Sequence, residues 1–293
     1  MSMVYVYIAA ILFARVIQAV FNKRSSNKIS GVCMSFRYIS YQYAISALLG
    51  LVLLFFETGG KPDVLTLLIS ALSGISLFFS SLFGIYGMKS GTVSLVSIFS
   101  TAGLIIPIAA GVFMFDRPIS LMQGVGVGIF FISAWLLIKS SRSIYGNFSF
   151  KTLLLLLGAM AANGITMLAQ QMYTYYAPNG SISMFSFISF GLASVFGAGM
   201  SFIIPNNEKQ ELKIEKDLII CGIALAGAIF VINQFVTALT VSLPPVLLFT
   251  LVNGGGTVIS AVTAAVMYKE RLSAASVAGI IAGVISLIII KAF

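Results

Sequence analysis

The sequence predicts an all-α polytopic membrane protein with ten transmembrane helices arranged as two inverted five-helix repeats. Three observations lead to this prediction. Only 9% of the 293 residues are charged, whereas soluble domains carry about 25%. Ten apolar runs are long enough for a helix to cross a bilayer, which takes about 20 residues. Finally, the two halves of the chain end in similar motifs.

The ten runs follow one another with short polar breaks, and they lack the period-two alternation of an outer-membrane β-barrel. The first half, residues 1–145, contains runs at about 3–22, 33–56, 64–87, 92–115 and 119–139. The second half, residues 146–293, contains runs at about 152–177, 181–204, 218–241, 245–267 and 273–291. No signal-peptide pattern fits the start of the chain, so we expect the first run to stay in the membrane.

The first run carries Arg15 near its middle, where a charge costs about 2.5 to 3.5 kcal/mol on insertion scales. All eight acidic residues lie in loops or at the ends of runs, so the predicted interior holds a cation and no carboxylate. Three interpretations of Arg15 are open. Its planar fork can bind a carboxylate or phosphate, it can pair with carbonyls and polar neighbours, or it can reach back to the interface.

The fourth and ninth runs are interrupted by helix-loosening residues at nearly corresponding positions. Gly103 and Pro107 interrupt the fourth run, and Gly254, Gly255 and Gly256 interrupt the ninth. Such paired interruptions are typical of the substrate site of inverted-repeat transporters, because Gly and Pro loosen the helical hydrogen-bond ladder. The alternative is close packing of helices through small residues.

Uncharged polar side chains lie deep in several runs and complete the predicted substrate site. They are Gln18, Ser81, Thr101, Asn163, Thr166, Asn233, Gln234 and Asn253. In a membrane, such side chains either join helices through hydrogen bonds or line a transport path.

A duplicated motif precedes the last run of each half: an acidic residue, an arginine and, shortly after, a serine. Allowing one inserted residue, the matched positions are Asp116 and Glu270, Arg117 and Arg271, Ser120 and Ser273, and Gly126 and Gly279. Five helices per repeat are an odd number, so the second copy must be inverted. The acidic residues favour the starts of the last helices. As an alternative, the acidic–arginine pairs form a gate at the interface.

With Phe36-Arg37 early in the second run and Pro107 in the fourth, these motifs make the chain resemble the drug/metabolite transporter superfamily, specifically its ten-helix EamA-type exporters. The resemblance covers the whole chain through its repeat and implies an exporter fold. The chain departs from the family pattern at Asp116, where Glu is usual, and at Pro118, which follows the arginine. Arg15 stands about where many relatives have an aromatic residue, so the family's usual site chemistry does not simply carry over.

The composition excludes several classes of function. The chain has no histidine, no P-loop and no metal-ligand spacing around its two cysteines. We therefore expect no enzyme, no cofactor and no metal. The net charge of +9 comes from basic residues clustered in short loops, which indicates a lipid bilayer rather than a nucleic acid as the partner.

The predicted function is a secondary transporter that exports a small anionic or zwitterionic metabolite, such as an amino acid, by alternating access in an inner or plasma membrane. An exchanger of phosphorylated solutes or nucleotide sugars is the same-fold alternative. A membrane-embedded lipid enzyme and a scaffold are less favoured. Loops after odd-numbered runs carry 12 of the Lys and Arg residues, and the other loops and the termini carry 3. The charge rule therefore places the odd loops in the cytoplasm, whereas the resemblance more often implies cytoplasmic termini.

Overall fold

The computed structural model describes residues 2–57, 63–90, 93–116, 118–145, 149–203, 215–267 and 273–292, and every regular element in these ranges is a helix. In chain order the helices are α1 (Ser2–Lys28), α2 (Val32–Leu54), α3 (Val64–Ser90), α4 (Val93–Ala102), α5 (Ile105–Met114), α6 (Leu121–Tyr145), α7 (Phe150–Tyr176), α8 (Ile182–Ile203), α9 (Lys216–Thr240), α10 (Pro245–Phe249), the π-helical turn η1 (Thr250–Gly254), α11 (Gly255–Met267) and α12 (Ala274–Ala292).

Eight helical stretches in the described residues are long and apolar enough to cross a bilayer: α1, α2, α3, α4 with α5, α7, α8, α9, and α10 through α11. Shorter apolar stretches lie in α6 at Leu121–Ser133 and in α12 at Val277–Ile290. The outer surface is apolar as well, since Phe113 and Phe202 are 85% and 83% exposed. Soluble monomers rarely expose large apolar patches, so the structure supports the predicted multi-pass membrane protein.

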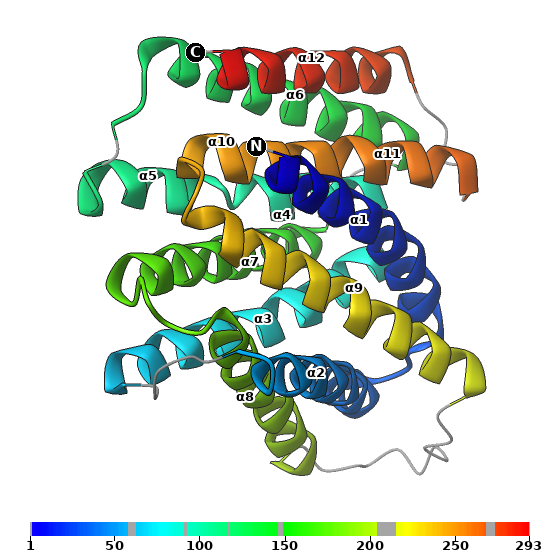
Figure 1. Cartoon of the computed structure of the whole chain (residues 1–293). Coiled ribbons are helices and arrows are strands. Elements are labelled where there is room, and N and C mark those ends of the chain that lie inside the picture. Colours follow the sequence, from blue (N-terminus) through cyan, green and yellow to red (C-terminus); the bar gives the residue numbers. More distant parts are fainter. Residues whose placement is uncertain are drawn as a thin grey trace.

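The helix ends gather at two faces of the molecule. At the first, which we call the Lys28 face, α1 ends and α9 begins, and Arg24 and Lys28 pair with Asp217 at 2.9 and 2.8 Å. At the second, which we call the Glu57 face, α2 ends and α8 begins, and the Glu57 carboxylate accepts a hydrogen bond from the Ser183 hydroxyl at 2.5 Å. The helices α3, α5, α7 and α10 have their Glu57-face ends on the left in Figure 1.

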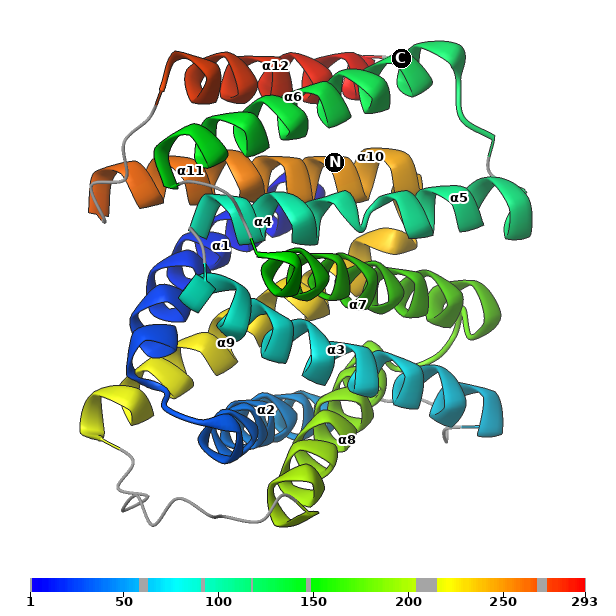
Figure 2. The same ribbon diagram turned by 180° about the vertical axis from the view of Figure 1, so that it is seen from behind.

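The helices α6 and α12 pack along each other as an outer pair, seen at the top of both views (Figures 1 and 2). Glycine permits this contact, because a Cβ on Gly126 would lie 2.5 Å from Cγ1 of Ile290. Next to this pair lie the two interrupted segments, α4–α5 and α10–α11. The remaining helices α1, α2, α3, α7, α8 and α9 lie on the other side of these segments.

Several helices begin with side-chain caps that the sequence encodes, among them α6 and α3. Ser120, the serine of the duplicated motif, accepts a hydrogen bond from the Gln123 N–H at 3.1 Å, and the Gln123 side chain accepts one from the Ser120 N–H at 3.2 Å. This capping box starts α6 and gives the hydroxyl of the motif a structural role. Asp63 caps α3, and hydrogen bonds from the hydroxyl and the N–H of Thr66 hold the pKa of Asp63 below its ordinary value.

Candidate functional site

The fourth predicted run is two short helices joined by a tight turn at Gly103 and Leu104. In a continuous helix the ring of Pro107 would clash with the carbonyl of Gly103, and proline has no N–H to donate to it. The backbone tightens instead, with Ile106 N–H donating to Gly103 O and Leu104 N–H to Thr101 O, both at 3.0 Å. The interruption therefore lies where the sequence predicts it.

The ninth predicted run is interrupted by the π-helical turn η1. Side chains donate hydrogen bonds to backbone carbonyls around this turn. The Asn253 amide donates to Phe249 O and the Thr257 hydroxyl donates to Asn253 O, both at 3.0 Å. Thr101 of α4 donates to the same Asn253 carbonyl at 3.3 Å. The two interrupted segments are thus hydrogen-bonded to each other, and π-helical turns are frequent at functional sites.

Arg15 of α1 points towards this turn. Its Nη2 donates to Asn253 Oδ1 at 3.0 Å and its Nη1 to Gln18 Oε1 at 2.9 Å. Its Nε–H is buried and has no hydrogen-bond partner among the described residues. Gly256 leaves the space that the side chain occupies, since a Cβ there would lie 3.4 Å from Cδ and Nε of Arg15. The guanidinium therefore lies in the interior and keeps a donor that lacks an acceptor.

A cavity of about 140 Å³ lies beside Arg15 and is walled by α1, α2, α3, α4, α7, α9 and the α10–α11 segment. From Asn253 it extends towards the Lys28 face as far as Asn22 on α1 and Met88 on α3. Lys23 marks that end, because its ammonium group donates to the carbonyl of Met88 at 3.2 Å. Among the lining residues that the structure describes, Arg15 is the one charged side chain.

The cavity brings together most of the polar residues that the sequence singles out. Those that line it are Arg15, Gln18, Ser81, Thr101, Asn163, Thr166, Asn233 and Asn253. Hydrogen bonds between helices hold several of them in place: the Asn163 amide donates to Ser100 O at 2.8 Å, and the hydroxyls of Thr166 and Ser76 are 3.0 Å apart. The two interpretations of these residues are therefore compatible, because one side chain both joins helices and lines the cavity.

Of the five predicted break residues, Gly256 is the one that lines the cavity. Gly103 instead packs on α7, where an added Cβ would overlap the carbonyl oxygen of Met160. Gly255 faces α1, with a built Cβ 3.0 Å from Leu12. Pro107 and Gly254 are buried and do not line it. Gly103 and Gly255 thus allow close packing, because an added Cβ would meet α7 at the first position and α1 at the second.

Gln234, predicted as part of the substrate site, does not line the cavity. Its carbonyl accepts from the Ser186 hydroxyl at 2.7 Å, and its amide nitrogen donates to the Ser183 hydroxyl at 2.9 Å. Successive helix positions point about 100° apart, so the neighbouring Asn233 faces the cavity while Gln234 faces α8.

The gate residues predicted from the duplicated motif are mostly outside the described residues, which include Asp116 but not Arg117, Glu270 or Arg271. Asp116 follows α5 with a φ of 49°, a left-handed conformation that Asp tolerates better than most residues. Among the described residues, ion pairs instead join α1 to the start of α9 at the Lys28 face.

Gln170 and Tyr43 also line the cavity, although neither is among the residues predicted for the site. The Gln170 amide donates to Asn233 Oδ1 at 3.0 Å. A spacing signal exists for Gln170, which lies one turn after Thr166 on the same face of α7. Tyr43 is buried, and its hydroxyl lies 2.7 Å from the hydroxyl of Ser81. No sequence signal marks Tyr43 as a cavity residue, because tyrosines are also common at membrane interfaces.

No protein-family model and no curated protein matches the chain. A solved structure described as "Crystal structure of protein" has a similar fold, with a TM-score of 0.72 over 97% of this chain and 98% of that one. The two sequences are 11% identical, so this similarity concerns the fold alone. The arrangement of the helices is therefore one that another protein adopts over almost its full length.

Proposed function

We propose that the protein is a secondary transporter that moves a small anionic or zwitterionic metabolite across an inner or plasma membrane by alternating access. The observation that carries the proposal is the guanidinium of Arg15, which stands beside the cavity with an unpaired, buried Nε–H. A buried donor without an acceptor is costly. A carboxylate can accept from the guanidinium in the bidentate geometry that arginine favours, which would remove this cost.

The remaining lining of the cavity supports an anion over a cation. Arg15 has no carboxylate partner among the described lining residues, and its two hydrogen bonds go to the neutral amides of Gln18 and Asn253. Its positive charge is therefore not compensated. Export of cations usually relies on an intramembrane carboxylate, and the described lining contains none.

The size of the cavity favours a small substrate. Pockets for drug-sized ligands have volumes of about 300–1,000 Å³, compared with about 140 Å³ here. A phosphorylated solute or nucleotide sugar, the same-fold alternative, would also call for several cations, whereas the described lining provides Arg15. A metabolite of the size of a small amino acid or hydroxy acid fits both observations better.

The ten-helix, inverted-repeat arrangement is part of the proposal. Four helices contribute cavity residues in the same helical spacing: Arg15, Gln18, Ala19 and Asn22 on α1; Asn163, Thr166, Met167 and Gln170 on α7; Leu77, Ser80, Ser81 and Gly84 on α3; Ile229, Ile232, Asn233 and Val236 on α9. Each set begins equally far from the first residue of its helix. This correspondence supports pairing α1 with α7 and α3 with α9 across the two halves, residues 1–145 and 146–293. In this arrangement α6 and α12 complete the ten spans.

A thermal-shift screen of the purified protein in detergent tests the substrate class. The panel contains lactate as an anion, L-alanine as a zwitterion and choline as a permanent cation. A ligand that binds the native state raises the melting temperature in proportion to its saturation. We expect stabilisation by at least one of the carboxylates and none by choline; the reverse result would overturn the proposal.

A substitution at Asn253 tests the uncompensated charge. Asn253→Asp would place a carboxylate 3.0 Å from the Arg15 guanidinium without a change in side-chain shape. We expect binding of the carboxylate ligand to weaken about 100-fold, because the new charge pairs with Arg15 and repels an anion. Binding titrations of the variant beside Asn253→Ala, which removes the acceptor without adding charge, separate the two effects. Equal affinities in both variants would argue against anion binding at Arg15.

A further inference from the structure

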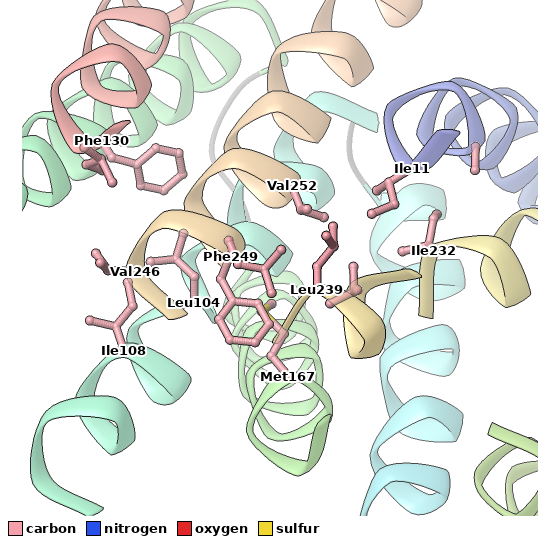
Figure 3. Close-up of a cluster of buried hydrophobic side chains, with 14 of the residues drawn as sticks. Ile11, Leu104, Ile108, Phe130, Met167, Ile232, Leu239, Val246, Phe249 and Val252 are labelled. Carbon is pink, nitrogen blue, oxygen red and sulfur yellow. The ribbon is translucent and has the colours of Figure 1, made fainter. Parts of the chain in front are cut away.

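The cavity ends before it reaches the Glu57 face. Its floor on that side is formed by Met167, Phe249, Val236 and Val252, all four of which belong to one cluster of buried apolar residues. Figure 3 shows Met167, Phe249 and Val252 among the other members of this cluster. If the protein transports a solute, the solute must pass this apolar floor to leave at the Glu57 face. The inference below therefore rests on the proposed function and deepens it.

The correspondence between α3 and α9 indicates where the closed half of the path lies. On α3 the lining continues from Gly84 to Ile85 and Met88, towards the Lys28 face. By the same spacing, Val236 on α9 corresponds to Gly84, and Thr237 and Thr240 correspond to Ile85 and Met88. Because α9 ends at the Glu57 face, these two threonines stand on the far side of the floor. They are 0% and 3% exposed, so this half is closed.

The polar side chains on this closed half lie on α7 and α9, and one hydrogen bond between them joins the two helices. Thr240 of α9 donates to the hydroxyl of Thr174 on α7 at 3.1 Å. Thr237 donates to the carbonyl of Asn233, which lines the cavity. On α7, Gln170 lines the cavity, and Thr174 lies one turn further towards the Glu57 face. A seam of hydroxyl and amide groups thus connects the cavity with that face.

Gln171 adds an unsatisfied group on the side of α7 that faces α5 and α10. Its side chain is 3% exposed, and neither its amide nitrogen nor its carbonyl oxygen has a hydrogen-bond partner among the described residues. It lies one turn beyond Met167 on the same face of α7. At its other end it approaches α5 and α10: a Cβ on Gly111 would lie 3.5 Å from Gln171 Nε2 and 3.6 Å from Pro245 Cγ.

An unpaired buried amide is costly in a native structure and calls for an explanation. Side chains that are polar but closed off in one conformation become useful in another, where water or a ligand reaches them. The position of Gln171, beyond the apolar floor and on the α5–α10 side of α7, is where a solute would arrive after passing Met167 and Phe249. Its amide N–H can donate to a carboxylate, and its carbonyl can accept from an amino group.

We propose that the second half of the transport path runs along the seam between α7 and α9, defined by Thr174, Thr237 and Thr240, with Gln171 on the α5–α10 side of α7. In the conformation that opens to the Glu57 face, the Gln171 amide binds the polar end of the carboxylate-bearing metabolite. The floor residue Met167 separates this second binding position from Arg15 in the present conformation.

Cysteine accessibility tests the path without knowledge of the substrate. In full-length protein with Cys33→Ala and Cys221→Ala, reconstituted in liposomes, Thr237→Cys and Gly84→Cys are treated with a membrane-impermeant maleimide from either side. Gly84 lines the cavity and has open space at its Cβ. We expect the two cysteines to be labelled from opposite sides of the membrane.

Ser189→Cys is the matched control, because Ser189 on α8 is another buried hydroxyl residue, 1% exposed, away from the seam. We expect Thr237→Cys to react at least tenfold faster than this control. Labelling of Thr237→Cys at the rate of Ser189→Cys, or from the same side as Gly84→Cys, would overturn the proposed path.

The role of Gln171 is tested by Gln171→Leu, which keeps most of the volume and removes the unpaired amide. We expect a higher melting temperature, because the present conformation no longer buries an unsatisfied group, and severalfold slower labelling of Thr237→Cys. Gln234→Leu is the control; it removes an amide that bonds Ser183 and Ser186 and should lower the melting temperature. If Gln171→Leu lowers the melting temperature as much as Gln234→Leu does, Gln171 has a structural role and the proposal for this residue is wrong.

Failure of this inference and failure of the proposed function give different results. If the seam is not the path, the labelling pattern fails while carboxylates still stabilise the protein through Arg15. If Arg15 does not bind an anion, the thermal-shift screen fails whatever the labelling shows.

Discussion

Arg15→Ala is expected to abolish transport of the carboxylate-bearing metabolite and to weaken its binding by at least about 100-fold. Hydrogen bonds to charged groups contribute about 1.5–3 kcal/mol each. The loss of two such bonds corresponds to roughly a hundredfold or more in the dissociation constant. The cavity offers no second described cation to replace the guanidinium, so we expect no residual high-affinity binding.

The fold itself should tolerate this substitution. Arg15 lacks an acidic partner among the described residues and bonds Gln18 and Asn253, two amides that can be reached by water in the enlarged cavity. Transport of the metabolite into liposomes and binding to the purified protein are measured together with the melting temperature. Arg15→Lys is the matched control: it keeps the charge but not the planar fork, and it should bind more weakly than the native protein and more tightly than Arg15→Ala. Normal transport by Arg15→Ala would exclude the proposed site.

Gly103→Ala is expected to cause the largest loss of stability from a single added methyl group, about 3 kcal/mol. An alanine Cβ would overlap the carbonyl oxygen of Met160 and lie 2.9 Å from the backbone nitrogen of Gly164. Both atoms belong to the backbone of α7 and cannot move aside as a side chain does, so α4 and α7 must separate. Overpacking of this kind costs about 1–3 kcal/mol and sometimes more.

Gly128→Ala on α6 is the control for Gly103→Ala, because no atom lies within 4 Å of a Cβ built there. In a helix interior alanine is favoured over glycine by about 0.5–1 kcal/mol. The control should therefore melt at the same temperature as the native protein or slightly higher. Thermal unfolding of both variants in detergent measures the difference. Equal melting temperatures would show that the contact between α4 and α7 can relax.

The membrane class, the positions of the main helices and the places where two of them are interrupted can all be predicted from the amino-acid sequence. These features depend on local chemistry. An apolar run of sufficient length forms a helix in lipid because its backbone must be hydrogen-bonded internally, and Pro107 interrupts its helix because it cannot bond the carbonyl of Gly103. The anomaly of Arg15 was equally visible, since a charge in an apolar run needs no structure to be noticed.

Which residues face the cavity and which face another helix becomes clear only when the helices are packed together. Asn233 and Gln234 are neighbours with similar side chains, yet the first lines the cavity and the second bonds Ser183 and Ser186 on α8. Gly103 and Gly256 likewise belong to corresponding interruptions, but one packs on α7 and the other makes room for Arg15. In a soluble protein the polar face of a helix would indicate its orientation. Within a bilayer the lipid is as apolar as the protein interior, so the sequence pattern is nearly the same on both faces and the direction of each side chain is set by packing.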